Sequence, residues 1–174
     1  SKRLVRRRLR QPCASSSSPP ARYSSSLVAI NTRDRSLAAA TISPTTVSGG
    51  IYIRALSNIT APNITAPGEL QFIADHALAL ADVNATGALG LSAGGDLTFG
   101  NATSGANAIL SATGAISGTT LAATGSASAT AGHALTLTGN ATASTALTLA
   151  AGDDLTVADI SFGTAVNLSG HTIT

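Results

Sequence analysis

The sequence predicts an all-β fold, a β-solenoid in which short parallel strands stack coil upon coil. From Ile51 onward, mostly aliphatic residues recur in three columns with a period of about 19 or 20, and a fixed period in this range is typical of a solenoid, whose coils contact only their neighbours. Within a coil, large residues alternate with small or polar ones, as in Asp96-Leu97-Thr98-Phe99, and this period of two is typical of strands. Helical spacing is not sustained, and Gly, Thr and Asn recur too often for stable helices.

In each of the three columns, successive members are one repeat apart in the sequence. Sixteen of the 20 positions are Leu, Ile or Val. The first column is Ile51, Leu70, Leu89, Ile109, Ser128, Leu147 and Val166; the second is Ile59, Leu78, Leu97, Ile116, Leu135, Leu155 and Thr174; the third is Ile64, Val83, Ala102, Leu121, Ala141 and Ile160. Three columns predict about three short strands per coil and a roughly triangular cross-section, with the coils about 4.8 Å apart.

Residues 48–174 are expected to form six to seven such coils. A longer internal repeat supports this register, because the segment from His76 to Phe99 matches the segment from His133 to Val157. The offset between the two segments grows by one from their start to their end, which predicts a unit of three coils with one inserted residue. One coil cannot bury enough apolar surface to be stable alone, so several must stack.

Residues 1–47 have a different composition: a basic start, then a Ser-rich run and a Pro-Pro pair. Such a segment is expected to be disordered and, as far as Arg22, dispensable for the fold. Its Arg- and Ser-rich start also resembles an organelle transit peptide, with a solvated linker or a wrongly chosen start site as alternatives. The short apolar runs 27–30 and 37–42 could form an imperfect first coil.

The charges divide sharply along the chain. All ten Lys and Arg residues lie at or before Arg54, where Asp34 is the only acid, giving +9; residues 55–174 hold seven acids and no Lys or Arg, giving −7. A region without cations cannot neutralise phosphates, which argues against nucleic-acid binding. Cys13 is the only cysteine, so no internal disulfide can form. No stretch reaches the roughly 18 apolar residues that cross a bilayer. The start at Ser1 and the stop in mid-pattern suggest a piece of a longer protein.

Several motifs resemble the repeats of filamentous-haemagglutinin-type adhesins, large bacterial exoproteins exported by two-partner secretion. These motifs are the segments beginning GALGLSAGGDLTF at Gly87, GAISGTTLAATG at Gly114, GHALTLTGNATAS at Gly132 and LTLAAGDDLTV at Leu147. The resemblance covers about residues 51–174, in period and composition. It implies a right-handed parallel β-helix shaft, secreted or displayed on the bacterial cell surface. The family's secretion domain is not recognisable here, and the Arg-rich start departs from the pattern.

The function expected from this resemblance is that of a non-enzymatic shaft in an adhesin that attaches to cells or surfaces. Its partners would be protein or glycan receptors, bound through the full-length protein, and an outer-membrane secretion partner. End-to-end self-association of this chain is also expected, because a solenoid end exposes an apolar layer and strand edges. The alternative is a fragment of a β-helical carbohydrate-active enzyme, a polysaccharide lyase or hydrolase. A groove of clustered acids and cations would favour the enzyme. An unbroken stack of coils without cations would favour the shaft.

No residue is predicted to be catalytic, to bind a cofactor or to ligate a metal. Asp153 and Asp154 are adjacent, and neighbours on a strand point to opposite faces, so turn positions explain them better than a catalytic pair. His76 and His133 occupy equivalent positions three coils apart, too far to share a metal, and His171 is placed outside their register. Asp96 and Asp153 near glycines suggest calcium-binding β-rolls, but the nine-residue repeat of those proteins is absent.

Two further patterns allow alternatives. Six Asn-X-Ser/Thr sequons are glycosylation acceptors if the chain passes through a glycosylating pathway, although Asn and Thr are also ordinary turn residues; they begin at Asn58, Asn63, Asn84, Asn101, Asn140 and Asn167. An outward column of hydroxyls is formed by Thr98, Ser117, Thr136 and Thr156. Ice-binding solenoids need two such columns side by side, and the next one here is predicted to be mixed: Gly90, Leu110, Ala129, Thr148 and Asn167.

Overall fold

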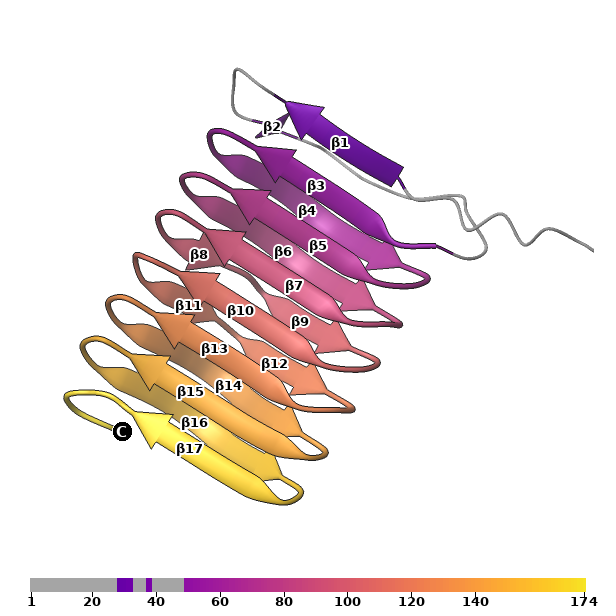
Figure 1. The fold of residues 1–174 in the computed structure, drawn as a ribbon. Helices are drawn as coiled ribbons and strands as arrows, with labels where there is room; N and C mark the ends of the chain where they lie inside the picture. The colour runs from indigo at the N-terminus through magenta and orange to yellow at the C-terminus, as the bar shows by residue number, and fades with distance from the viewer. Residues whose placement is uncertain (1–27, 33–36, 39–48) are drawn as a thin grey trace, which may run out of the picture.

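The strands of this protein stack in parallel rows to form a β-solenoid of about six turns with a repeat of about 19 residues. The computed structural model describes residues 28–32, 37–38 and 49–174, and no helix occurs among them. Figure 1 shows the rows following one another from the amino-terminal to the carboxyl-terminal end. The predicted fold class is confirmed. The predicted disorder of residues 1–47 falls mostly outside the described residues.

One wall of the solenoid is an eight-stranded parallel sheet, here called the flat sheet. Each coil contributes one strand of five or six residues, and neighbouring strands keep a continuous register. In order along the solenoid, the strands are β1 (Val28–Thr32), β3 (Ile51–Ala55), β5 (Leu70–Ala74), β7 (Leu89–Ala93), β10 (Ala108–Ala112), β13 (Ala127–Ala131), β15 (Ala146–Ala151) and β17 (Ala165–Ser169).

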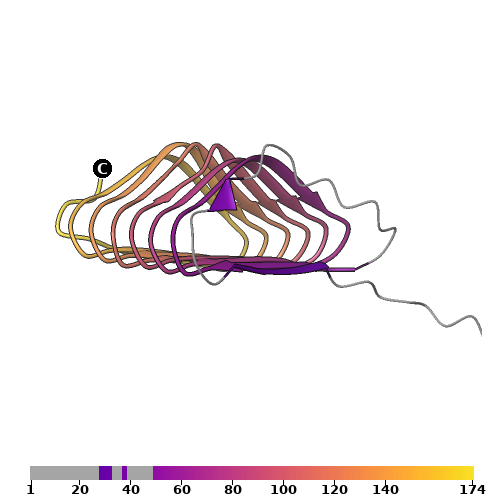
Figure 2. The same ribbon diagram turned by 90° about the horizontal axis from the view of Figure 1, so that it is seen from above.

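The opposite wall is a nine-stranded sheet that bends in the middle, here called the bent sheet. In some coils one strand of eight or nine residues runs through the bend, and in others two shorter strands flank it. The strands are β2 (Leu37–Ala38), β4 (Ile59–Ala66), β6 (Leu78–Ala85), β8 (Leu97–Thr98), β9 (Asn101–Ser104), β11 (Ile116–Gly118), β12 (Thr120–Ala123), β14 (Leu135–Ala143) and β16 (Leu155–Phe162). Seen from above, each coil has one flat side and one arched side (Figure 2). The three predicted rows of strands therefore exist, but two of them belong to one sheet.

Strands β1 and β2 add a further row before the first complete coil. Val28 pairs with Ile51 and Leu37 pairs with Ile59, both in parallel. The short apolar runs near residues 27–30 and 37–42 therefore contribute strands, within the segment that composition alone set apart from the solenoid.

The core is a stack of aliphatic layers between the two walls. The second and third predicted columns are confirmed almost entirely: Leu97, Ile116, Leu135 and Leu155 are successive partners and are buried. Ile64, Val83, Ala102, Leu121, Ala141 and Ile160 also pair in sequence. At the carboxyl-terminal end Leu155 pairs with Ile173, one residue before the predicted Thr174.

The first predicted column was wrong at two positions. Leu89 pairs with Ala108, which pairs with Ala127, so these alanines line the core. Ile109 instead points outward and is 61% exposed, and Ser128 shares its face. Because alternate residues of a strand point to opposite faces, a one-residue slip reverses every side chain. The prediction followed the larger residue, whereas the sheet keeps an unbroken register from β7 through β10 to β13.

The inserted residue of the three-coil unit lies at the bend of β14. Leu135 pairs with Leu155, an offset of 20, whereas Asn140 pairs with Asp159, an offset of 19, and the register shifts between Leu137 and Asn140. The bend therefore absorbs one extra residue as a bulge, and the strand pairing resumes beyond it.

Candidate functional site

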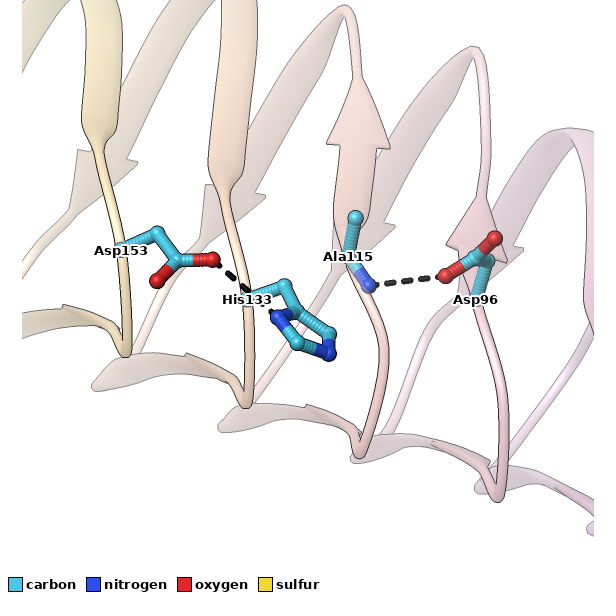
Figure 3. Close-up of polar contacts among 4 residues, drawn as sticks. All are labelled: Asp96, Ala115, His133 and Asp153. Carbon is cyan, nitrogen blue, oxygen red and sulfur yellow. Dashed lines mark hydrogen bonds and ion pairs between the residues drawn. The ribbon is translucent and has the colours of Figure 1, made fainter.

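The acids and amides of the turns have a structural task. Asp96 follows β7 and directly precedes β8, and its Oδ1 accepts a hydrogen bond of 2.9 Å from the backbone N–H of Ala115 in the next coil (Figure 3). Asn58 accepts from Ala77 in the same way, at 3.0 Å. A side chain at the start of one strand thus satisfies a backbone donor in the next coil, where the turn has left the sheet ladder.

The same arrangement occurs at the other two corners of the coil. Asn107 Oδ1 accepts from the backbone N–H of Ser126 at 2.9 Å, on the turn that leads into the flat sheet. At the bend, Asp82 Oδ1 accepts from both the backbone N–H and the side-chain amide of Asn101. These polar residues therefore share one role, a side-chain bridge from one coil to the next.

Asp153 and Asp154 are both exposed in the turn before β16. Asp153 Oδ2 lies 3.1 Å from Nδ1 of His133 in the preceding coil (Figure 3). Both side chains are about two-thirds exposed, so the pair is largely hydrated and contributes little to stability. Of the two aspartates, the first is thus engaged with the histidine of the preceding coil.

The three histidines share one register position, which corrects the placement of His171. Backbone N–H groups donate from coil to coil down this column: Gly95 to His76, Gly114 to Gly95, His133 to Gly114, Asp153 to His133 and His171 to Asp153. His76 and His133 are separated by two glycine rows, as their spacing predicts. His171 takes this position because the last coil is shorter. Leu155 pairs with Ile173, whereas the period predicts pairing with Thr174. Within the described part of the chain, no three His, Cys, Asp or Glu side chains are grouped to hold a metal.

The outward columns are also set by the register. Thr98, Ser117, Thr136 and Thr156 stack as expected on the bent sheet. The predicted second column was wrong at Leu110 and Ala129, which are buried. The residues in their place are Ile109 and Ser128, so the outward column of the flat sheet is Tyr52, Gln71, Gly90, Ile109, Ser128, Thr148 and Asn167.

The six sequon asparagines are spread over the outer surface of the solenoid. Four of them lie on the half of the bent sheet that follows the bend: Asn63, Asn84, Asn101 and Asn140. Each of these four is exposed. Asn58 and Asn101 use their side chains in bonds between coils.

The outer face of the flat sheet carries a hollow that sequence analysis did not predict. At Gly90, in the middle of β7, no side chain fills the column between Gln71 and Ile109. The result is a depression of about 480 Å³. It is bordered by Ile73, Ser92 and Ser111 on the adjacent outward column and by Glu69 and Asn107 at the turn. A smaller depression of about 240 Å³ continues toward Tyr52 and shares Glu69 and Gln71 with the first.

Glycine at position 90 could have signalled this feature, since a glycine inside a strand weakens it and often marks a bulge, a bend, or the close approach of a ligand or another backbone. Its neighbours in three dimensions could not be read before the register was known.

Comparison with known proteins gives no relative: no protein-family model, curated protein or solved structure matches this chain. A helix that could span a membrane is not found among the described residues.

Proposed function

We propose that this chain is a structural shaft segment of a large bacterial adhesin, secreted or displayed on the cell surface, which mediates attachment to cells or surfaces. The observation that carries the proposal is the construction of the coils. Nearly every interior position is aliphatic, and the buried polar exception among the described residues, Ser104, bonds to the backbone of Gly87 and Asn107. Such a rod can be lengthened by adding coils, because each one needs only its neighbours.

The distribution of charge supports a scaffold over a catalyst. A hydrolase needs two carboxyl groups facing one substrate bond, and a lyase needs a base with a cation or metal nearby. In the described residues, Asp82 and Asp96 accept backbone hydrogen bonds between coils. The cation Arg54 lies at the amino-terminal end of the flat sheet, 3.7 Å from Asp75. These groups serve the stacking of coils.

The test uses the bacterium that carries the gene and the purified chain. Deleting the gene should reduce attachment of the cells to host cells or to abiotic surfaces, and restoring it should recover attachment. An antibody against the chain should label intact cells, and the label should disappear after brief external proteolysis.

Unchanged attachment, or a chain that stays inside the cell, would contradict the proposal. The enzyme alternative makes a different prediction: the purified chain would release reducing ends or unsaturated products from polysaccharides. Sustained turnover in that assay would replace the shaft with the enzyme.

A further inference from the structure

We propose that the hollow at Gly90 on the flat sheet binds a neutral glycan chain. This inference deepens the proposed function and rests on it, since it names the class of receptor that a surface-displayed shaft would contact along its side. The hollow is defined by Gln71 before it, Ile109 after it, the two serines beside it and Glu69 and Asn107 at its edge.

The first argument is that Gly90 has no structural reason to be glycine. At most glycines of the described turns and bends, a Cβ would press on the backbone of the preceding coil, as at Gly94 against Asp75. At Gly90 the nearest atom to such a Cβ is Cγ of Gln71 at 3.5 Å, an ordinary contact. Its φ is not in the left-handed region. A strand interior favours β-branched or aromatic residues, so the glycine weakens β7 and leaves a space open.

The second argument is the chemistry of the lining. Sugars present hydroxyls at their edges and C–H groups on their faces, so their sites combine apolar surface with a few convergent polar groups. Here the side chains of Ile73 and Ile109 provide apolar surface. The amide of Gln71, the carboxylate of Glu69 and the hydroxyls of Ser92 and Ser111 provide donors and acceptors. Tyr52, on the continuation of the depression, offers an aromatic ring beside the same Glu69 and Gln71.

The third argument concerns shape and charge. The two depressions follow the solenoid axis across successive coils, which are about 4.8 Å apart, so the track suits an extended chain of rings lying along it. The residues that line it include one carboxylate and no Lys or Arg. An acidic sugar would meet repulsion from Glu69. The neighbouring cation, Arg54 beside Ile73, already faces the carboxylate of Asp75 at 3.7 Å, so the site selects neutral glycans.

The experiment fills the hollow and asks whether binding is lost. Gly90→Gln places a second amide side chain on the Gln71 column, in space that the structure leaves open. Ser128→Gln is the matched control, because it adds the same side chain to the same outward column beyond the hollow. Binding of the purified full chain and both variants is measured by calorimetry and by retention on immobilised glycans. The probes are cellohexaose, chitohexaose and mannohexaose, with hexagalacturonate as the acidic comparison.

We expect at least one neutral probe to bind the parent chain and Ser128→Gln alike, and Gly90→Gln to bind it at least about tenfold more weakly. Gly90→Gln should melt at the same temperature as the parent or higher, which separates loss of binding from loss of fold. Tyr52→Ala should also weaken binding. The inference is overturned if no neutral probe binds, if hexagalacturonate binds as well as they do, or if Gly90→Gln binds as the parent does.

The failure of this site and the failure of the proposed function are distinguishable. If the gene supports attachment but the chain binds none of the neutral probes, the glycan site is wrong and the shaft stands. If the chain binds a neutral glycan through Gly90 but the gene has no effect on attachment, the site stands and the adhesin function is wrong.

Discussion

The aromatic ring of Phe99 occupies the space that a side chain at Gly118 would need. The two residues lie in successive coils and both face the interior of the solenoid. A Cβ added to Gly118 would overlap the Phe99 ring. Both positions are buried. The layers above and below hold Leu80 and Leu137 at the equivalent places. One large and one small residue, Phe99 and Gly118, thus stand in two neighbouring coils where the coils on either side have a leucine each.

This pairing predicts strong coupling between the two positions. Gly118→Ala should lower the free energy of unfolding by about 1–3 kcal/mol because the core is overpacked. Phe99→Leu should also destabilise the chain through lost packing, whereas the double variant Phe99→Leu/Gly118→Ala should recover part of the loss. Urea unfolding of the four proteins measures the coupling. Strictly additive losses would contradict the contact.

The registers of the two sheets predict opposite results for two isoleucines of the same coil. Ile116 is buried in the column of Leu97 and Leu135, so Ile116→Ala should cost about 2–5 kcal/mol of unfolding free energy. Ile109 is exposed, so Ile109→Ala should change the free energy by no more than about 0.5 kcal/mol. Thermal or urea unfolding of the two variants provides the comparison. Equal losses at both positions would place Ile109 in the core and refute the register of β10.

The bridges between coils predict that Asp96 is needed for its oxygen more than for its charge. Asp96→Ala should lower the unfolding free energy by about 1 kcal/mol, because the N–H of Ala115 loses its acceptor. Asp96→Asn should retain most of the stability, since Asn58 makes the same bond with an amide oxygen. Urea unfolding of both variants measures the difference.

The matched control for Asp96 is Asp154→Ala. Asp154 lies at the same place in its turn, before the equivalent strand, and no side-chain bond of this kind is found for it among the described residues. Its loss should stay within about 0.5 kcal/mol. If Asp96→Asn were as damaging as Asp96→Ala, charge and not hydrogen bonding would explain the contribution of Asp96 to stability.

The carboxyl-terminal row predicts that the full chain associates end to end. Val166 belongs to an interior column yet is 40% exposed, and Phe162 is 44% exposed; both lie in the last row of strands among the described residues. An exposed apolar layer with unpaired strand edges favours association. Sedimentation should show an average mass that rises with concentration.

Val166→Asp should reduce this association by placing a charge on the exposed layer. Asn167→Asp introduces the same group on the adjacent outward position and should have a smaller effect. A chain that remains monomeric at high concentration would show that its ends are not adhesive.

The sequence by itself determined the class of fold and much of the core. Leu97, Ile116, Leu135 and Leu155 each stand between polar or small neighbours, so only one phase of a period-two strand can bury them, and the spacing of one coil then makes them stack. The turn role of Asn58 was open to prediction from its place before such a strand.

Only the tertiary structure decided the features that depend on contacts between coils. In Ala108-Ile109-Leu110 three apolar residues follow one another, so both phases satisfy the hydrophobic pattern, and pairing with β7 selected the phase that buries Ala108 and Leu110. His171 joined the histidine column because the last coil is one residue shorter than the usual repeat. The hollow at Gly90 exists because Gln71 and Ile109 stand on either side of it in neighbouring coils. These three outcomes share one physical reason: each depends on which residues of different coils become neighbours, and inter-strand hydrogen bonding fixes that register across the whole sheet.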